Sequence, residues 1–210
     1  GKSLPQVTAF IELLAAARMN RSGVVIGLGR GITGDVAGVV ASVYQRGIPW
    51  VNCPTTLLAM VDASVGGKTG VNLTIRAEGG PETITLKNMI GTFHQPVLVV
   101  ADIAVLESLP DRVFRAGLAE CIKHGMIAAD WGDAGLLHWT RDTLPAILSR
   151  DCGALAELIA RNVAIKARVV ASDERESGTD PGGGRMALNL GHTFAHAIEP
   201  MPGLSPDADP

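Results

Sequence analysis

The chain has 210 residues, of which 47% are hydrophobic and 19% are charged, and its formal net charge is −3 at pH 7. This composition excludes an intrinsically disordered chain, because enough apolar side chains are present to form a core. It also provides no global positive potential for nucleic acid, so an anionic ligand has to be held by a local group of cations.

The cysteines and the apolar runs indicate where the protein works. Cys53, Cys121 and Cys152 are an odd number at wide spacing, without a Cys-x-x-Cys pair, which predicts free thiols and a cytoplasmic location. No apolar run is long enough to cross a bilayer, so we expect no membrane as partner. Because the net charge is −3, we also expect no nucleic acid as partner. Because the chain begins without methionine, we expect a fragment that lacks both termini of a longer protein.

The hydrophobic spacing predicts an α/β part followed by a helical part. Before Pro110 helical and strand-like segments alternate, which is typical of a parallel sheet. Helices are expected at 4–19 and 33–46, the second capped by Thr33, and strands at 24–28, 50–54 and 98–102. After Pro110 only helices are expected, at 111–129, 151–172 and 185–199. Residues 73–86 are interpreted as a mobile loop and 177–184 as a second loop, and the predicted domains are 1–110 and 111–210.

A glycine-rich turn joins the first predicted strand to the helix that follows it. The segment GLGRGITGD at 27–35 lies where the pyrophosphate of a dinucleotide binds free backbone N–H groups. Gly29, Gly31 and Gly34 match the dinucleotide spacing only if Arg30 is accepted between them. A cofactor site and a simple tight turn therefore both remain open on this motif alone.

Two lysines stand out by their surroundings. Lys68 follows two glycines in DASVGGKTG, but a P-loop needs a further glycine four residues earlier, which disfavours a nucleotide triphosphatase. Lys68 suits a phosphate or carboxylate contact, and a solvated loop lysine is the alternative. Lys166 lies on or beside the apolar stripe of helix 151–172, so it either extends to solvent or reaches a buried anion.

Polar side chains at helical spacing suggest two further groups. Glu120 and Lys123 are three residues apart, either as a surface ion pair or as part of a buried group, and their apolar neighbours disfavour a fully wet face. In the last predicted helix a polar stripe follows helical steps, through Arg185, Asn189, His192 and His196. Histidines four apart can bind one metal ion, but the stretch lacks the glutamate of a zinc peptidase, and two unrelated surface histidines are the alternative.

These motifs, taken together and in order, resemble the 3-dehydroquinate synthase family of sugar phosphate cyclases. The resemblance covers nearly all of residues 23–199. Its segments are GLGRGITGDVAG, YQRGIPWVNCPTTLLAMVDASVGGKTGVN, LKNMIGTFHQP, LPDRVFRAGLAECIKHG, IKARVVASDERE and MALNLGHTFAHAIE. The resemblance implies a Rossmann-like NAD-binding α/β domain followed by an all-helical metal-binding domain, and a homodimer.

The family activity implied is that of a lyase in the shikimate pathway. Its substrate is the sugar phosphate 3-deoxy-arabino-heptulosonate 7-phosphate (DAHP), which is converted to 3-dehydroquinate and phosphate. NAD oxidises the C5 hydroxyl and is regenerated, and zinc or cobalt polarises the C5 oxygen. The transient ketone acidifies the neighbouring C–H, which allows phosphate to leave before the ring reopens and closes as a carbocycle.

The resemblance also implies roles for single residues. Glu120 and His192 match metal ligands, His196 matches a phosphate-side histidine, and Arg46 matches an arginine that reaches the neighbouring subunit. The remaining matches to substrate-holding groups are Lys123, Lys166, Arg185 and Asn189. Matches at the junction of cofactor and substrate are Asp62, Lys68 and Asn88. Matches to cofactor contacts are Gly29, Gly31, Asp35, Thr55, Thr56 and Lys87.

The chain departs from the family pattern in three places. The third metal ligand, a histidine in an HGE motif, is expected beyond Pro210, and the first strands of the nucleotide domain are missing. Arg30 replaces the middle glycine of the turn, so it either pairs with a phosphate or weakens cofactor binding. The alternatives are a deoxy-inosose or valiolone synthase, a metal-dependent polyol dehydrogenase, and a truncated chain that binds nothing. We expect the 210-residue piece alone to be inactive, because two ligands hold a metal poorly.

Overall fold

A three-stranded parallel sheet forms part of the first half of the chain. The computed structural model describes residues 1–76, 82–176 and 184–198. β1 (Val25–Gly29) pairs with β2 (Trp50–Pro54), and β2 pairs with β5 (Leu98–Val99), in the order β1-β2-β5. The parallel pairing confirms the α/β interpretation, although the strand expected at 98–102 is shorter than predicted.

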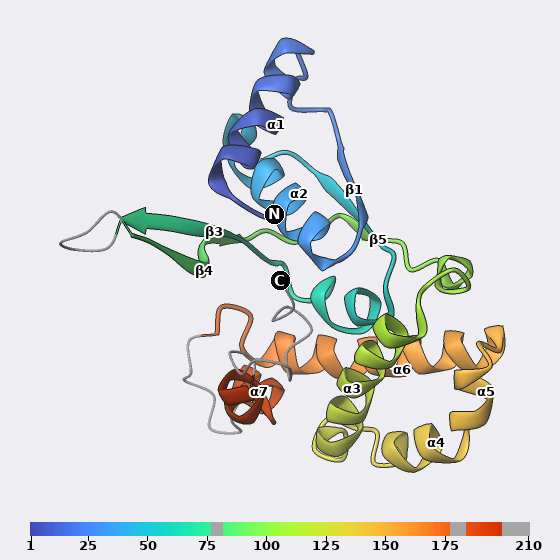
Figure 1. The fold of residues 1–210 in the computed structure, drawn as a ribbon. Coiled ribbons are helices and arrows are strands. Elements are labelled where there is room, and N and C mark those ends of the chain that lie inside the picture. The colour runs from blue at the N-terminus through green and yellow to red at the C-terminus, as the bar shows by residue number, and fades with distance from the viewer. Residues whose placement is uncertain (77–81, 177–183, 199–210) are drawn as a thin grey trace.

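Two helices pack beside this sheet. α2 (Gly31–Val43) contacts β1 and β2, and α1 (Leu4–Ala16) lies against α2 (Figure 1). Their shared core consists of Val7, Val36, Val39, Val40 and Val71. Thr33 as helix cap was wrong: α2 starts two residues before it, and the N–H groups of Thr33 and Gly34 donate to the carbonyl of Arg30.

The segment interpreted as a mobile loop belongs largely to a β-hairpin, so that interpretation was wrong. β3 (Lys68–Arg76) pairs antiparallel with β4 (Thr83–Phe93), and the register shifts between Val71 and Leu73 (Figure 1). The residues VNLTIR at 71–76 and TITLK at 83–87 do alternate apolar and polar side chains, which is a strand signal, and the Gly-Gly-Pro between them led to the loop interpretation. Residues 77–81 lie outside the described residues.

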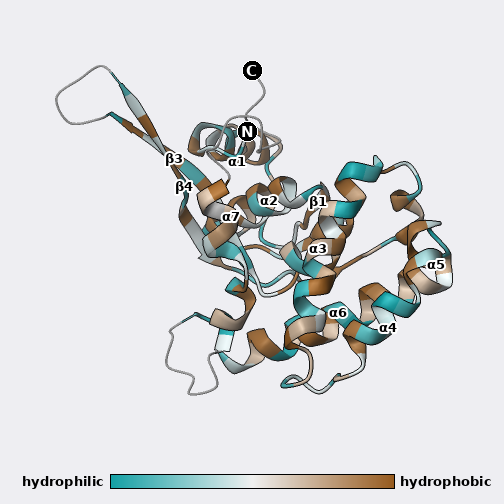
Figure 2. Ribbon diagram, turned by 60° about the horizontal axis from the view of Figure 1, so that its bottom comes forward, coloured by the Kyte–Doolittle hydropathy of each residue, from teal (hydrophilic) through white to brown (hydrophobic). Residues whose placement is uncertain are grey.

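The second half is helical, as predicted. α3 (Asp111–Ile127) and α6 (Cys152–Ser172) match the expected helices, and two shorter ones lie between them, α4 (Leu136–Asp142) and α5 (Leu144–Leu148). Figure 2 shows hydrophobic and hydrophilic positions alternating along α3 and α6. The core that joins these helices to the segment after β2 includes Leu57, Met60, Leu106, Phe114, Leu118, Cys121, Leu155 and Leu158.

Short helical turns complete the described chain. They are η1 (Tyr44–Arg46), the π-helical η2 (Ala59–Ala63) and η3 (Ile103–Leu106). The single helix expected at 185–199 was wrong, because η4 (Gly184–Asn189) and α7 (His192–Ile198) are separate, with Gly191 at a φ of +82° between them. Of the loop expected at 177–184, residues 177–183 lie outside the described residues. Within the described residues, no helix is both long enough and apolar enough to cross a membrane.

Candidate functional site

Polar side chains converge where η2, α3 and α6 meet. We call this group the central polar cluster, and it consists of Asp62, Glu120, Lys123, His124 and Lys166. Asp62 lies in a π-helical turn, a form that is rare and frequent at functional sites. The cluster therefore brings together residues that are more than one hundred positions apart in the sequence.

The local sequence explains how α3 reaches η2. Glu120, Lys123 and His124 are three and four residues apart, so they project from one face of α3. Gly117, one turn earlier, lets the two segments approach closely, because a Cβ there would lie 2.6 Å from the backbone nitrogen of Leu58. A larger residue at 117 would push η2 and its carboxylate away from α3.

Lys166 is held by Asp62. Its Nζ lies 2.8 Å from Oδ1 of Asp62 and also donates to the backbone carbonyl of that residue. Burial lowers the pKa of Lys166, and the carboxylate of Asp62 opposes this effect. Burial alone would raise the pKa of Asp62, but the ammonium groups of Lys166 and Lys123 together outweigh it, so the carboxyl pKa is below its usual value. This pair confirms that Lys166 reaches a partly buried anion instead of solvent.

The other lysine and carboxylate of the cluster also pair with each other. Nζ of Lys123, which is 8% exposed, forms an ion pair with Oε2 of Glu120. Within the described residues that oxygen is buried and receives no hydrogen bond of acceptable geometry. The pair is therefore not the wet surface pair that the spacing left open, and the buried oxygen of Glu120 already faces one cation, the ammonium of Lys123.

His124 faces the same carboxylates from inside the protein. The ring is fully buried, its Nδ1 lies 3.1 Å from Oδ1 of Asn162, and its Nε2 lies 3.8 Å from Oδ1 of Asp62. Burial lowers the pKa of His124 to about 4, so the ring is neutral at pH 7. One ligand atom each from Asp62, Glu120 and His124 lies within 4.8 Å of the others, a spacing that suits a metal ion.

A second cleft joins α2 to the hairpin. It has a volume of about 470 Å³, and Asp35, Lys68 and Asn88 line it together, with Glu176 paired to Lys68. Asn88 has a φ of +54°, and its backbone N–H donates to Oδ1 of Asn72 at 3.1 Å. The structure thus groups three residues that the sequence assigned to cofactor and substrate.

The glycine turn lies at the carboxyl end of β1. Gly29 has a φ of +156°, and a Cβ there would lie 2.4 Å from Oγ1 of Thr33, so only glycine fits. Arg30 is exposed and lines a hollow of about 400 Å³ with Thr55 and Thr56. Gly31 opens α2, so its N–H and that of Ile32 have no acceptor within the helix and can bind an anion, whereas those of Thr33 and Gly34 donate to the carbonyl of Arg30.

Several predicted site residues are not members of the central polar cluster. Lys87 is exposed on β4, and Arg46 is exposed with a φ of +69°. Arg185 is 2% exposed and donates to the carbonyl oxygens of Gly66 and Glu174. Asn189 is exposed at the end of η4.

The two histidines of the last segment follow the break in the chain. His192 is half-buried at the start of α7, and it is not a member of the described three-residue group that suits a metal. The side chain of His196 lies outside the described residues. The continuous stripe from Arg185 to His196 was wrong, because Gly191 separates η4 from α7.

Sequence reasoning missed three side chains at these sites: His124, Asn162 and Asn72. Asn162 is fully buried and lies four residues before Lys166 on α6, so a second polar residue within an apolar stripe was a usable signal. His124 adjoins Lys123 in the quoted motif. Asn72 directly precedes the segment interpreted as a loop, and nothing in the sequence indicates that it shapes the backbone at Asn88.

Comparisons with known proteins agree with the resemblance. The profile of the 3-dehydroquinate synthase N-terminal family matches residues 1–116, and that of the C-terminal family matches 117–205. A 3-dehydroquinate synthase of Teredinibacter turnerae is 49% identical over 198 residues, covering 94% of this chain and 50% of that protein. One of Cereibacter sphaeroides is 46% identical over 204 residues, covering 97% and 50%. The chain thus spans about half the length of the curated relatives it matches.

Solved structures with a similar fold include synthases and a dehydrogenase. The 2-epi-5-epi-valiolone synthase of Streptomyces hygroscopicus subsp. jinggangensis, with NAD⁺ and Zn²⁺ bound, gives a TM-score of 0.78 at 28% identity, covering 95% of this chain and 51% of that one. A 2-deoxy-scyllo-inosose synthase complexed with carbaglucose-6-phosphate, NAD⁺ and Co²⁺ gives 0.72 at 29%, covering 94% and 49%. An iron-containing alcohol dehydrogenase of Thermotoga maritima gives 0.56 at 16%, covering 94% and 60%, a likeness of fold alone.

Proposed function

The chain belongs to the 3-dehydroquinate synthase family, and on that premise we propose that the whole protein converts DAHP to 3-dehydroquinate and phosphate. The observation that carries the proposal is the central polar cluster. Two ammonium groups and two carboxylates, from three separate segments, face one another in a largely buried space. Such a group binds a small, hydroxyl-rich anion and excludes water around it.

The cofactors proposed are NAD and a divalent metal, zinc or cobalt. The glycine turn fits a pyrophosphate, because it has no room for a Cβ at Gly29 and opens onto the N-terminus of α2. NAD would take a hydride from C5 of the substrate and return it later. We place its other contacts at Gly31, Asp35, Thr55, Thr56, Asp62, Lys68 and Lys87.

The proposed metal site fits the donor atoms at α3. The buried Oε2 of Glu120 faces the ammonium of Lys123 without a hydrogen bond of acceptable geometry within the described residues, and a carboxylate oxygen is a suitable ligand for a divalent cation. We propose Glu120 and His192 as ligands, and a third from the sequence after Pro210. The metal would polarise the C5 oxygen as a Lewis acid.

The protein's own side chains would hold and orient the substrate. Lys166, fixed by Asp62, and Lys123, fixed by Glu120, present ammonium groups to the hydroxyls and carboxylate of DAHP. Because the two lysines are already positioned by carboxylates, little side-chain entropy is lost when substrate binds. The other proposed contacts are Lys68, Asn88, Arg185, Asn189 and His196.

A phosphate-release assay of the whole protein tests this function. With NAD and zinc or cobalt, we expect DAHP to yield inorganic phosphate and dehydroquinate in equal amounts. Absence of phosphate release would contradict the proposal. Release from glucose 6-phosphate instead would indicate an inosose-type cyclase, the runner-up that the structural likeness favours.

Two variants on one helix connect the assay to the site. Lys166→Gln should lower kcat/KM by about 100-fold or more, because a charge-assisted contact to the reacting part of the substrate is lost. Arg168→Gln is the matched control, since Arg168 is exposed two residues further along α6 and donates to the carbonyl of Trp131. Equal activity of both variants would remove Lys166 from the site.

We also propose that the protein is a cytoplasmic homodimer with Arg46 at the subunit contact. Arg46 is exposed in a turn where it and Gln45 both have positive φ angles, which fixes the direction of the backbone. The described cysteines are free thiols, in agreement with a reducing compartment. Sedimentation of the whole protein checks the dimer, and Arg46→Glu should shift it toward the monomer.

A further inference from the structure

The amide of Asn162 fixes the tautomer of His124. Both side chains are fully buried, and Nδ2 of Asn162 donates to the carbonyl oxygen of Leu158 at 2.8 Å. The amide oxygen therefore faces the ring, 3.1 Å from Nδ1. Because an amide oxygen only accepts, Nδ1 of His124 carries the proton. In the neutral ring Nε2 is then an acceptor.

This acceptor points into the central polar cluster without a partner. Nε2 lies 3.8 Å from Oδ1 of Asp62, which is also an acceptor, so the two atoms cannot bond to each other. Within the described residues Nε2 makes no hydrogen bond. A buried acceptor that makes no hydrogen bond lowers the stability of the folded protein by about 1–3 kcal/mol. The arrangement therefore requires a donor from outside the protein.

The groups around Nε2 indicate the kind of donor. The nearby ammonium groups are already paired, Lys166 with Asp62 and Lys123 with Glu120. A hydroxyl group fits between two acceptors, because it donates one proton and its oxygen remains free to accept from a neighbouring lysine. Building on the proposed function, we propose that Nε2 of His124 binds a hydroxyl of the sugar phosphate, and that Asn162 is the positioning residue that aims it.

Two substitutions at one position separate the two ring nitrogens. Gln places its amide oxygen near the position of Nε2, whereas Asn reaches only the position of Nδ1. In the whole protein, His124→Asn should raise the KM for DAHP about tenfold with kcat nearly unchanged, because a hydrogen bond common to ground and transition states is lost. His124→Gln should stay within about threefold of the wild type. Equal KM values for His124→Asn and the wild type would overturn the inference.

A double-mutant cycle tests the role of Asn162. Asn162→Leu should raise the same KM, because the ring is no longer held in one tautomer. Combined with His124→Asn it should add little, since both substitutions remove one interaction. Additive effects would show that Asn162 acts independently of His124.

A measurement on the wild-type protein does not depend on the folding of any variant. With ¹⁵N-labelled histidine, the Nε2 signal of His124, assigned with His124→Gln, should be that of an unprotonated nitrogen. It should shift when an unreactive carbocyclic analogue of DAHP binds. A protonated Nε2, or no shift at saturation, contradicts the inference.

Further outcomes distinguish the hydroxyl contact from a metal-ligand role of His124 and from a failure of the proposed function. In the cobalt-loaded protein, a changed visible spectrum in His124→Gln would make His124 a metal ligand and overturn the hydroxyl contact. If the wild-type protein releases no phosphate from DAHP, the proposed function fails. An active wild type with an unaltered KM in His124→Asn overturns only the hydroxyl contact.

Discussion

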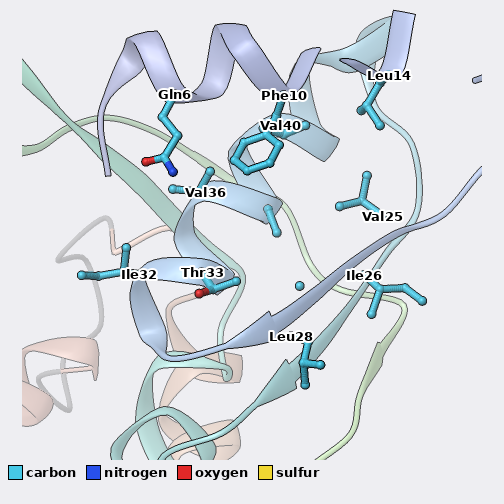
Figure 3. A pocket seen from close by; sticks show the side chains of 12 residues that line it. Gln6, Phe10, Leu14, Val25, Ile26, Leu28, Ile32, Thr33, Val36 and Val40 are labelled. Carbon is cyan, nitrogen blue, oxygen red and sulfur yellow. The ribbon is translucent and has the colours of Figure 1, made fainter. Parts of the chain in front are cut away.

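The helical part and the sheet part of this chain bury their apolar side chains to very different extents. In the helical part Leu158, Ile147 and Phe114 are buried in one core. In the sheet part Ile26 and Leu28 of β1 remain 66% and 68% exposed. Figure 3 shows both side chains along β1, beside a groove of about 420 Å³ between that strand, α1 and α2.

This difference in burial indicates which part of the chain contributes more to its stability. A strand of a parallel sheet is normally covered on both faces, whereas within the described residues β1 has α2 on only one side. The helical part packs against itself, and it carries most of the central polar cluster. We therefore expect substitutions in the helical core to have large effects, and substitutions on the open face of the sheet to have small ones.

The largest expected difference is between two leucine substitutions, one in each part. Leu158→Ala should lower the free energy of unfolding of the 210-residue chain by about 2–5 kcal/mol, because it leaves a cavity in a closed core. Leu28→Ala should change it by less than about 1 kcal/mol, since the side chain is already largely in water. Urea unfolding of both variants provides the measurement. Equal losses would mean that β1 is covered in solution.

A pair of glycines gives a smaller and more local effect. Gly117→Ala in α3 should destabilise the chain by about 1–3 kcal/mol, although alanine favours helices, because its Cβ would lie 2.6 Å from a backbone nitrogen. Gly31→Ala in α2 meets only a methyl group at 3.4 Å and should alter stability by less than about 1 kcal/mol. Thermal unfolding compares the two, and a stabilised Gly117→Ala variant would contradict the close approach of η2 and α3.

The smallest expected effect is a pH dependence of opposite sign in the two parts. Hydrogen bonds from Arg161 lower the pKa of Asp133 in the helical part, so its stabilisation is present above about pH 4 and is lost as the pH falls further. Burial raises the pKa of Asp35 in the sheet part despite its ion pair with Lys2, so its ionisation lowers stability as the pH rises above about 4.

Unfolding at several pH values measures both contributions. Asp133→Asn should remove part of the stability gained above pH 4, by about 1 kcal/mol or less for a partly exposed pair. Asp35→Asn should remove the loss that accompanies ionisation and make the chain more stable at pH 7. A change of the same sign in both variants would contradict the assigned surroundings.

The sequence predicts the elements that bury one face at a regular period. α6 and its lysine are an example, because the apolar stripe marks the buried side and Lys166 is out of place on it. The hairpin was missed because the Gly-Gly-Pro at 79–81 indicated a loop, although the residues on either side, 71–76 and 83–87, alternate apolar and polar side chains as strands do. The break at Gly191 was missed because its φ of +82° is a property of the backbone that helical spacing does not reveal.

The site was predictable by residue type but not by contact. The polar residues out of place in apolar surroundings and the family motifs pointed to Glu120, Lys123 and Lys166. The pairing of Lys166 with Asp62, 104 positions earlier, depends on how η2 packs against α6. The contact between His124 and Asn162 depends in the same way on the packing of α3 against α6.

α6 places Asn162 and Lys166 one turn apart, on the same stripe as the buried Leu158. Because a helix is rigid, a small rotation of α6 about its axis displaces both polar groups at once. An error of about 1 Å in a reacting group can slow an enzyme roughly a hundredfold. Substitutions that repack the core against α6 to raise the melting temperature should therefore be tested for turnover as well. A small displacement of the helix would lower the catalytic rate before it lowers the stability of the fold.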